Sequence, residues 1–472
     1  MITLDQSVKT RFCPSPSGLL HVGNLRTALF CVLLARSCQG RFLLRIEDTD
    51  KQRSEERYAE QIESDLLWLG LDWQEGPGHD GGHGPYHQSK RTAIYNDYYQ
   101  RLEAMSAVYP CFCTEEELAM ARKVQRASGK PPRYPGTCQH LSPEQIEAKW
   151  AEGRKPSLRF RVPTNREIRF TDLVRGEQTF RSDDLGDFII RRTDGSAPFL
   201  FGNAIDDALM EVTHVLRGED HVANTPRQIL ILETLGLPVP EYGHISLILA
   251  MDGKPLSKRH GSRSLVELRS EGYLPLAIVN YLARLGHYYG HDEFLSLEHL
   301  AAQFKLSSLS TSPAKYNPDQ LLFWQKQAIE RLSTEGLWDW LGIEFFSSLP
   351  DDKRTAFLEA IKPNILFPAD AYRWAKIIFG DEIAAHDLQT ASDPNYFNQT
   401  LIAYERYGAN AQSILDYLKI ELNLKGKMLY QPLRLALTGE AHGPELGKLM
   451  ALIEPEKIHQ RLLRAKQRAE NL

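Results

Sequence analysis

The sequence predicts an α/β fold that is split by an inserted α+β domain and followed by an all-α C-terminal half. A strand, a tight turn and a buried helix are expected in residues 8–34, and a second such series in residues 212–235. Between them, closely spaced cysteines and alternating strand patterns interrupt the fold. From Ser264 onward, apolar residues recur at helical spacing with few strand signals. This order is typical of a Rossmann-type domain that carries an insertion.

Length and composition favour a soluble protein of several domains. The chain has 472 residues, of which 42% are hydrophobic, enough for about three domains. It has no run of about 18 apolar residues and no signal-peptide pattern at its N-terminus, so we expect a cytoplasmic protein with no membrane partner. The net charge of -5 excludes a polybasic chain, but a large domain can still gather basic residues on one face for a nucleic acid.

The first turn is a candidate phosphate site. Residues 8–12 predict a buried strand, Pro and Gly residues end it, and residues 25–34 predict a buried helix. The N-terminus of such a helix offers free N–H groups and a positive dipole end to phosphates. Gly23 lets the backbone approach a ligand, and the His21 imidazole can donate a hydrogen bond to a phosphate oxygen. These residues alone leave open a purely structural turn.

A second strand and two helices are expected after the first helix. Residues 41–46 predict the strand, which delivers Glu47 at its end, where ligand contacts belong. Ser54 is the predicted N-cap of a helix closed by Gly70, and another helix is expected over residues 91–104. Three histidines lie in the Gly-rich loop between these helices: His79, His83 and His87. Because such a loop holds ligands poorly, we do not expect a metal there.

The predicted insertion contains two close pairs of candidate metal ligands: Cys111 with Cys113, and Cys138 with His140. This pairing matches a structural tetrahedral zinc site. The six cysteines are too few for a disulfide framework in a chain of this length. Strand-like alternation follows at residues 158–162, 168–170 and 188–191. The residues leave one alternative, ordinary reduced thiols in a small β domain.

Polar residues follow the strand that is predicted in the second half of the α/β fold. Residues 212–217 predict this strand, Asp220 and His221 follow it, and residues 226–235 predict the next helix. A strongly basic loop comes later, at residues 251–261. Cationic side chains on such a loop can clamp a phosphate, although a solvated turn carries similar residues.

The C-terminal part is predicted to be helical throughout. Apolar spacing indicates helices that include residues 274–285, 337–346, 371–378 and 446–453. Four tryptophans are expected in the core of these helices rather than as platforms for bases: Trp324, Trp338, Trp340 and Trp374. Residues 457–468 have a modest basic face, which suits either contact with the phosphate backbone of a nucleic acid or simple solubility.

Five segments, taken together, carry a family resemblance. They are Arg11-Phe-Cys-Pro-Ser-Pro-Ser-Gly leading to His21-Val-Gly-Asn24, Arg45-Ile-Glu-Asp-Thr-Asp50, Leu216-Arg-Gly-Glu-Asp-His221 with Asn224-Thr-Pro-Arg-Gln228, Leu256-Ser-Lys-Arg-His-Gly261 and Gln431-Pro-Leu-Arg-Leu-Ala-Leu-Thr-Gly439. Their order resembles that of class I aminoacyl-tRNA synthetases, and specifically of the bacterial-type glutamyl-tRNA synthetase family, along essentially the whole chain.

The resemblance implies ATP-dependent activation of L-glutamate to glutamyl-adenylate, with release of pyrophosphate. The glutamyl group is then transferred to the terminal adenosine of tRNA(Glu), and tRNA(Gln) stays open as a second acceptor. The expected ligands are ATP as substrate, Mg²⁺ on its phosphates and a structural Zn²⁺. Catalysis would rest on positioning and on electrostatic stabilisation of the α-phosphate, without a covalent enzyme intermediate. We expect a monomer.

Site roles follow from the motifs as the resemblance carries them over. Catalytic roles fall to His21, Lys258 and Arg259. Glutamate binding falls to Arg11, Ser15, Glu47, Asn203 and Arg217. ATP contacts fall to His21, Gly23, Asp220, His221, Leu249, Ser257 and Lys258. The zinc ligands would be Cys111, Cys113, Cys138 and His140. The glutamate set is physically reasonable, because a dianionic amino acid suits two arginines and its ammonium suits a carboxylate.

The resemblance also implies a division into domains. The two halves of the Rossmann-fold catalytic domain would be residues 1–104 and 195–248, separated by an acceptor-stem-binding insertion at 105–194. Residues 249–323 would form a helical stem-contact domain with the basic loop, and residues 324–472 an all-helical anticodon-binding domain.

Three residues depart from the family pattern. Pro255 stands where a lysine usually opens the basic loop, and Lys254 comes just before it. Asn24 ends the first motif where the class often has histidine, a change common within the family. Phe199 stands where many relatives have tyrosine, so a hydroxyl contact to glutamate is expected to be missing.

Three other functions fit the sequence less well. Enzymes that glutamylate a modified tRNA base lack the helical C-terminal domain, and glutaminyl-tRNA synthetases carry β-barrels there. A non-catalytic tRNA-binding paralogue would suit Pro255. Four retained residues argue against it: His21, Gly23, Ser257 and Lys258. The choice between tRNA(Glu) and tRNA(Gln) is expected to depend on residues 362–364, where Asn364 replaces an arginine of discriminating relatives.

Overall fold

The computed structural model describes residues 7–50, 53–129, 131–256, 263–380 and 393–471. The chain forms two compact units. The first comprises Met1–Leu268 with Pro275–Leu321, and the second Arg269–Leu274 with Leu322–Leu472. Each has its own hydrophobic core.

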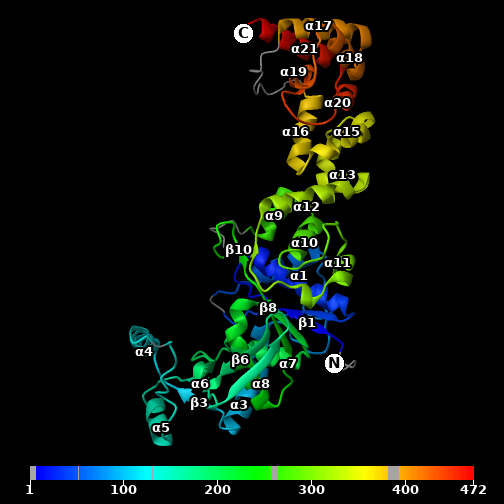
Figure 1. Cartoon of the computed structure of the whole chain (residues 1–472). Coiled ribbons are helices and arrows are strands. Elements are labelled where there is room, and N and C mark those ends of the chain that lie inside the picture. Colours follow the sequence, from blue (N-terminus) through cyan, green and yellow to red (C-terminus); the bar gives the residue numbers. More distant parts are fainter. Residues whose placement is uncertain (1–6, 51–52, 130, 257–262, 381–392, 472) are drawn as a thin grey trace. The chain divides into compact units, whose positions relative to one another are not determined.

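A parallel four-stranded sheet lies at the centre of the first unit (Figure 1). Its order is β2-β1-β8-β9, with β2 (Arg41–Leu44), β1 (Lys9–Phe12), β8 (His214–Gly218) and β9 (Glu241–Ile245). Every pairing is parallel. The first and second halves of the predicted fold therefore meet at β1 and β8, and their carboxyl ends share one edge of the sheet.

Helices from both halves of the α/β fold pack around this sheet. α1 (Val22–Ser37) packs on β1 and β8 and also contacts α10 (Pro275–Ala283) and α11 (Leu297–Gln303). Because it has neighbours on several sides, nearly all of its side chains from Leu25 to Ala35 are buried. The other helices of these halves are α2 (Glu56–Trp68), α3 (Thr92–Ala104), α7 (Phe199–Leu209) and α8 (Thr225–Leu235), with the short 3-10 helices η1 (Gln88–Lys90) and η2 (Glu219–Asn224).

The insertion combines two small sheets with short helices. One sheet is antiparallel, with β3 (Val108–Cys111), β4 (Ser157–Phe160) and β7 (Phe188–Arg191). The other is the hairpin of β5 (Glu167–Asp172) and β6 (Gly176–Arg181). Its helices are α4 (Glu115–Ala127), α5 (Pro143–Ala151) and α6 (Ser182–Leu185). The hairpin returns to the central sheet, since Leu173 N–H donates to the carbonyl of Tyr242 in β9 at 2.8 Å.

The chain then forms a small parallel pair of β10 (Ile248–Leu249) and β11 (Ala314–Lys315). Between these strands lie α9 (Leu265–Glu271), α10, α11 and η4 (Leu306–Ser308). The short strand β11 is a departure from the purely helical pattern expected after Ser264. It forms because the N–H groups of Ala314 and Tyr316 donate to the carbonyls of Leu247 and Leu249, and two residues are too few to give a sequence signal.

The second unit is helical in its described residues. After α12 (Pro318–Arg331) come α13 (Thr334–Leu341), α14 (Ile343–Ser347), η5 (Asp351–Lys353), α15 (Arg354–Ile361), η6 (Lys362–Asn364), α16 (Pro368–Phe379), α17 (Pro394–Tyr407), α18 (Ala411–Glu421), α19 (Lys427–Thr438), α20 (Leu446–Leu452) and α21 (Pro455–Glu470). Trp374 is fully buried in this core, Trp324 is also buried, and Trp338 and Trp340 pack against the core. The four tryptophans are therefore packing residues, as predicted.

The predicted fold class is confirmed: an α/β domain, an inserted α+β segment and a helical C-terminal half. One cap was wrongly predicted. α2 begins after Glu55, and the buried Ser54 hydroxyl makes no hydrogen bond. The Ser54 backbone N–H instead donates to the carbonyl of Asp50. Ser54 is therefore part of the turn that precedes α2, and Glu55 takes the N-cap position. Among the described residues, no helix is long and apolar enough to cross a membrane.

Candidate active site

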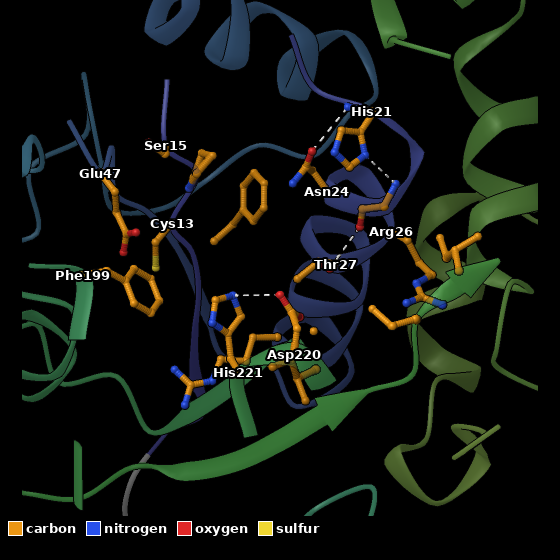
Figure 2. Close-up of a pocket in the computed structure, with 18 of the residues that line it drawn as sticks. Cys13, Ser15, His21, Asn24, Arg26, Thr27, Glu47, Phe199, Asp220 and His221 are labelled. Carbon is orange, nitrogen blue, oxygen red and sulfur yellow. Dashed lines mark hydrogen bonds and ion pairs between the residues drawn. The ribbon is translucent and has the colours of Figure 1, made fainter. Parts of the chain in front are cut away.

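A cavity of about 540 Å³ opens at the carboxyl edge of the central sheet, beside the N-terminus of α1 (Figure 2). The ends of β1 and β8 form its floor, and α1, α7 and the segment after β2 contribute side chains. Ligands in parallel α/β sheets bind at this edge, because polar loops follow every strand there.

Nine of the predicted site residues line this cavity: Arg11, Ser15, His21, Gly23, Glu47, Asn203, Arg217, Asp220 and His221. Leu249 is not among its lining residues, although its neighbour Ile248 is. Ser257, Lys258 and Arg259 lie outside the described residues.

The first turn has the geometry of an anion site. His21 is the N-cap of α1, and its Nδ1 atom accepts a hydrogen bond from Gly23 N–H at 3.2 Å. Because Nδ1 is the acceptor, a neutral imidazole carries its proton on Nε2, which can donate to a ligand. Figure 2 shows His21 and Asn24 together at this helix end, across the cavity from Glu47.

Arg11 is fixed by a buried network at the end of β1. Its Nε atom lies 3.2 Å from Asp207 of α7, and its Nη2 atom donates to Asn203 Oδ1 at 3.4 Å. Although burial acts against the charged form, Asp207 raises the pKa of Arg11. Arg11 therefore presents a permanent positive charge to the cavity.

Glu47 faces Arg11 and Asn203 as the acidic member of the site. It is only 8% exposed, lies 3.6 Å from Arg45 and accepts a hydrogen bond from the Asn203 amide. Burial raises the pKa of Glu47 to about 7, against the opposing effects of Arg45 and Asn203. Its charge is thus sensitive to pH near neutrality.

Sequence reasoning missed the charges that support these residues. Arg45 is fully buried, and its Nη1 atom lies 2.9 Å from Asp207, while its Nε atom lies 3.8 Å from Asp206. Asp206 also accepts from Arg91 Nε at 2.7 Å and from the Tyr95 hydroxyl at 2.7 Å. The available signal was the pair Asp206 and Asp207 inside the largely apolar helix α7, since buried carboxylates need partners.

Arg217 is the second arginine of the cavity. Its Nε and Nη2 atoms donate to His244 and Thr225, whereas its buried Nη1 atom has no hydrogen-bond partner. Burial lowers the pKa of Arg217 to about 10, so the group stays charged at neutral pH. A ligand carboxylate would satisfy the unpartnered Nη1 atom.

Two of the departures from the family pattern have clear positions. Phe199 stacks on His221, with ring centroids 5.1 Å apart, and burial lowers the pKa of His221. Pro255 lines the cavity, but Lys254 does not, and its Nζ atom lies 3.7 Å from Asp252. Lys254 therefore does not replace the missing lysine at the cavity wall in this arrangement.

Three thiols gather in the insertion. The Sγ atoms of Cys111, Cys113 and Cys138 lie within 4.8 Å of one another, and those of Cys113 and Cys138 are 3.7 Å apart. Zn–S bonds of about 2.3 Å place two thiolates of a tetrahedral site about 3.8 Å apart, so the spacing suits zinc. His140 is not part of this group. Instead, the Tyr134 hydroxyl lies 3.4 Å from Cys111 Sγ and 3.7 Å from Cys113 Sγ, a neighbour that the sequence reasoning missed.

The histidine loop makes hydrogen bonds rather than a ligand cluster. His83 Nδ1 lies 2.8 Å from Glu75, and His87 Nδ1 lies 3.3 Å from Asp48. Within the described residues, the three thiols of the insertion are the one group with metal-binding geometry.

Comparison with known proteins identifies the class of this fold and site. Residues 7–323 match the family described as tRNA synthetases class I (E and Q), catalytic domain. Residues 334–466 match an anticodon binding domain. The chain belongs to this class I tRNA synthetase family, which confirms the predicted resemblance.

Full-length relatives point to one branch of the family. The chain is 58% identical to glutamate–tRNA ligase 1 of Coxiella burnetii, over 97% of this chain and 99% of that protein. It is 54% identical to glutamate–tRNA ligase 2 of Nitrosococcus oceani, over 97% and 98%. A crystal structure of a glutamate tRNA ligase from Elizabethkingia meningosepticum in complex with its amino acid matches with a TM-score of 0.87 at 29% identity, over 98% of this chain and 99% of that one.

Proposed function

We propose that this chain activates L-glutamate with ATP and transfers the glutamyl group to the 3'-terminal adenosine of tRNA(Glu). The observation that carries the proposal is the cavity at the N-terminus of α1, which holds Arg11, Arg217 and Glu47. The full-length relatives are named as glutamate–tRNA ligases, and the anticodon binding domain fits a tRNA partner. A cytoplasmic location and a monomeric state are part of the proposal.

The charges of the cavity suit glutamate. Its two carboxylates can pair with Arg11 and Arg217, and its ammonium with Glu47. Asn203 donates to Glu47 and accepts from Arg11, so it can orient both side chains for contact with the substrate. Ser15 supplies a further hydroxyl at the wall.

ATP would occupy the side of the cavity at α1. The His21 Nε2 proton can stabilise charge on the α-phosphate, and the close backbone at Gly23 leaves room for the nucleotide. Asp220 and His221 also line the cavity and can supply further polar contacts, whereas Leu249, Ser257 and Lys258 are assigned by motif alone. Lys258 and Arg259 would add positive charge in the transition state. Mg²⁺ carried by the ATP phosphates would reduce the charge on the leaving pyrophosphate.

Zinc would serve the insertion as a structural ion. The three thiols fit it by type and spacing, and the Tyr134 oxygen contacts two of them, whereas the predicted ligand His140 is not part of the group. We therefore propose three cysteine ligands, with the fourth position taken by Tyr134, His140 or water.

The test is aminoacylation by the purified full-length enzyme with ATP, tRNA(Glu) and either glutamate, glutamine or aspartate. The tRNA is included because the family resemblance implies that activation needs it. We expect the enzyme to charge tRNA(Glu) with glutamate and not with glutamine or aspartate. Arg217→Ala should lower kcat/KM for glutamate about a hundredfold, since a charge-assisted pair is lost. Arg101→Ala, a change on the exposed face of α3, is the control and should behave like wild type.

Normal glutamate kinetics in Arg217→Ala would overturn the substrate assignment. Binding of tRNA(Glu) without any charging would instead support the non-catalytic paralogue. Charging of the separate tRNA(Glu) and tRNA(Gln) pools then tells whether the enzyme serves one acceptor or both.

A further inference from the structure

Arg217, His244 and Thr225 form a buried triangle of hydrogen bonds, on the side of the guanidinium away from its unpartnered Nη1 atom. Arg217 Nε donates to His244 Nε2 at 3.1 Å, and Arg217 Nη2 donates to Thr225 Oγ1 at 2.8 Å. Thr225 Oγ1 lies 3.1 Å from the same His244 Nε2. His244 and Thr225 are fully buried, so no water competes for these bonds. This triangle fixes the plane of the guanidinium.

The triangle requires one particular form of His244. Arg217 Nε–H can only donate, so Nε2 is the unprotonated nitrogen and the ring proton sits on Nδ1. The Thr225 hydroxyl must then also act as a donor to Nε2. Nδ1 makes a short hydrogen bond to Asp172 Oδ2. The carboxylate thus selects the tautomer, because it can accept but not donate.

The surroundings of His244 favour the neutral ring. The charged and titratable groups that face it are Asp172, Arg217, Arg175, His221 and the stacked Tyr242. Burial and the two arginines lower the pKa of His244, although Asp172 opposes them. Asp172 itself is charged, because hydrogen bonds from His244 and from backbone N–H groups outweigh its burial and lower its pKa.

Asp172 does not come from the catalytic halves of the chain. It ends β5 of the inserted hairpin, where Oδ1 accepts backbone hydrogen bonds from Val174 and Arg175, each at 2.9 Å, and from His244 at 3.2 Å. The hairpin approaches β9 at Gly243, where a Cβ would lie 3.3 Å from Leu173 of the hairpin turn. The same Cβ would lie 2.6 Å from the Leu216 side chain of β8.

We propose that Asp172 of the insertion is a positioning residue for Arg217, acting through the Nδ1–H tautomer of His244. The inserted domain would then contribute directly to the shape of the glutamate site, in addition to its predicted contact with the acceptor stem. This inference rests on the proposed function, since it takes the glutamate carboxylate as the ligand of Arg217.

The first test is Asp172→Asn in the full-length enzyme. Three backbone N–H groups hold the Oδ1 position, so the asparagine oxygen would occupy it and the amide NH₂ would face His244. This would force the ring proton onto Nε2, where it opposes Arg217 Nε–H and the Thr225 hydroxyl. We expect KM for glutamate to rise about tenfold, as for other partners that orient a ligating group. KM for ATP and the melting temperature should change little.

The second test separates the tautomer from a general loss of structure. In His244→Gln, the side-chain oxygen can accept from Arg217 whatever stands at position 172. The Asp172→Asn change should therefore have almost no further effect on KM for glutamate in the His244→Gln background. Asp187→Asn is the matched control: this carboxylate is also in the insertion, and it accepts from Tyr109 and Val162 instead.

An equal rise in KM for glutamate in both backgrounds would overturn the proposal, as would an unchanged KM in Asp172→Asn. An increase of the same size in KM for ATP would also overturn it, because it would indicate a general distortion. Failure of the wild-type enzyme to charge glutamate would refute the proposed function instead, so the two failures are distinguishable.

Discussion

Glu47 is a buried carboxyl whose ionisation has a direct consequence for ligand binding. Its pKa is raised to about 7 by burial, even with Arg45 beside it. The protonated form has no negative charge to offer an ammonium group. If Glu47 holds the ammonium of the substrate, binding must therefore strengthen as the pH rises through 7.

We expect KM for glutamate to fall about tenfold between pH 6 and pH 8, as the ionised fraction of Glu47 grows. The measurement is the pH profile of KM in the charging assay. Glu47→Gln, which keeps the size and loses the charge, should have a high KM that hardly varies over this range. A flat wild-type profile would contradict the role of Glu47.

Gly23 is required by the close approach of His21. A Cβ on residue 23 would lie 3.2 Å from His21 Cε1 and 3.3 Å from Nδ1. We expect Gly23→Ala to displace the imidazole and to lower the rate of glutamate activation at least tenfold, with a smaller change in glutamate affinity. Pyrophosphate exchange with tRNA present measures this rate.

Gly18→Ala is the control for that change, since Gly18 lies in the same turn and a Cβ there meets nothing within 4 Å. If both variants lose the same activity, the turn as a whole and not the His21 contact is responsible.

At the scale of elements, the thiol-bearing part of the insertion has very little core of its own. Its buried cluster consists of Tyr109, Cys111, Phe112 and Cys138, with a few half-buried neighbours. Helices α4 and α5 contain no fully buried residue. Apolar burial gives such a segment too little free energy of folding to order it. A structural metal commonly supplies the missing stabilisation.

We expect one zinc per chain in the purified enzyme and its loss in Cys138→Ser. Limited proteolysis should then cut first in α4 and α5, while the rest of the first unit stays intact. Metal content and the cleavage sites are the measurements, and Cys38→Ser, at an exposed cysteine, is the control. A full zinc content in Cys138→Ser would contradict the site.

At the scale of the whole molecule, the chain has two compact units with separate cores. The cavity proposed for glutamate and ATP is in the first unit, whereas the match to an anticodon binding domain lies in the second. A ligand that binds only one folded unit stabilises that unit.

We expect two transitions in calorimetry of the full chain. Glutamate with a non-hydrolysable ATP analogue should raise only one of them, by about 5 °C near 100 times Kd. Cys138→Ser should lower the same transition. A single transition that moves as a whole would contradict the independence of the units.

Local patterns in the chain were enough to predict the first turn. The strand, the break and the helix around His21 and Gly23 depend on neighbouring residues, so periodicity and turn chemistry specify them. The same holds for the apolar helices of the second unit and for Trp374 in their core. The cap at Ser54 failed because its hydroxyl became buried, which a local pattern cannot foresee.

The sequence by itself therefore determined the order of elements, the family and nine of the residues that line the cavity. Only the tertiary structure decided which distant charged and polar groups meet: Arg45 with Asp207, Asp172 with His244, and Tyr134 rather than His140 with the thiols. The physical reason is that a strand or helix is specified by neighbours along the chain. The partner of a buried charge is specified by which segments pack against each other, and that depends on the whole fold.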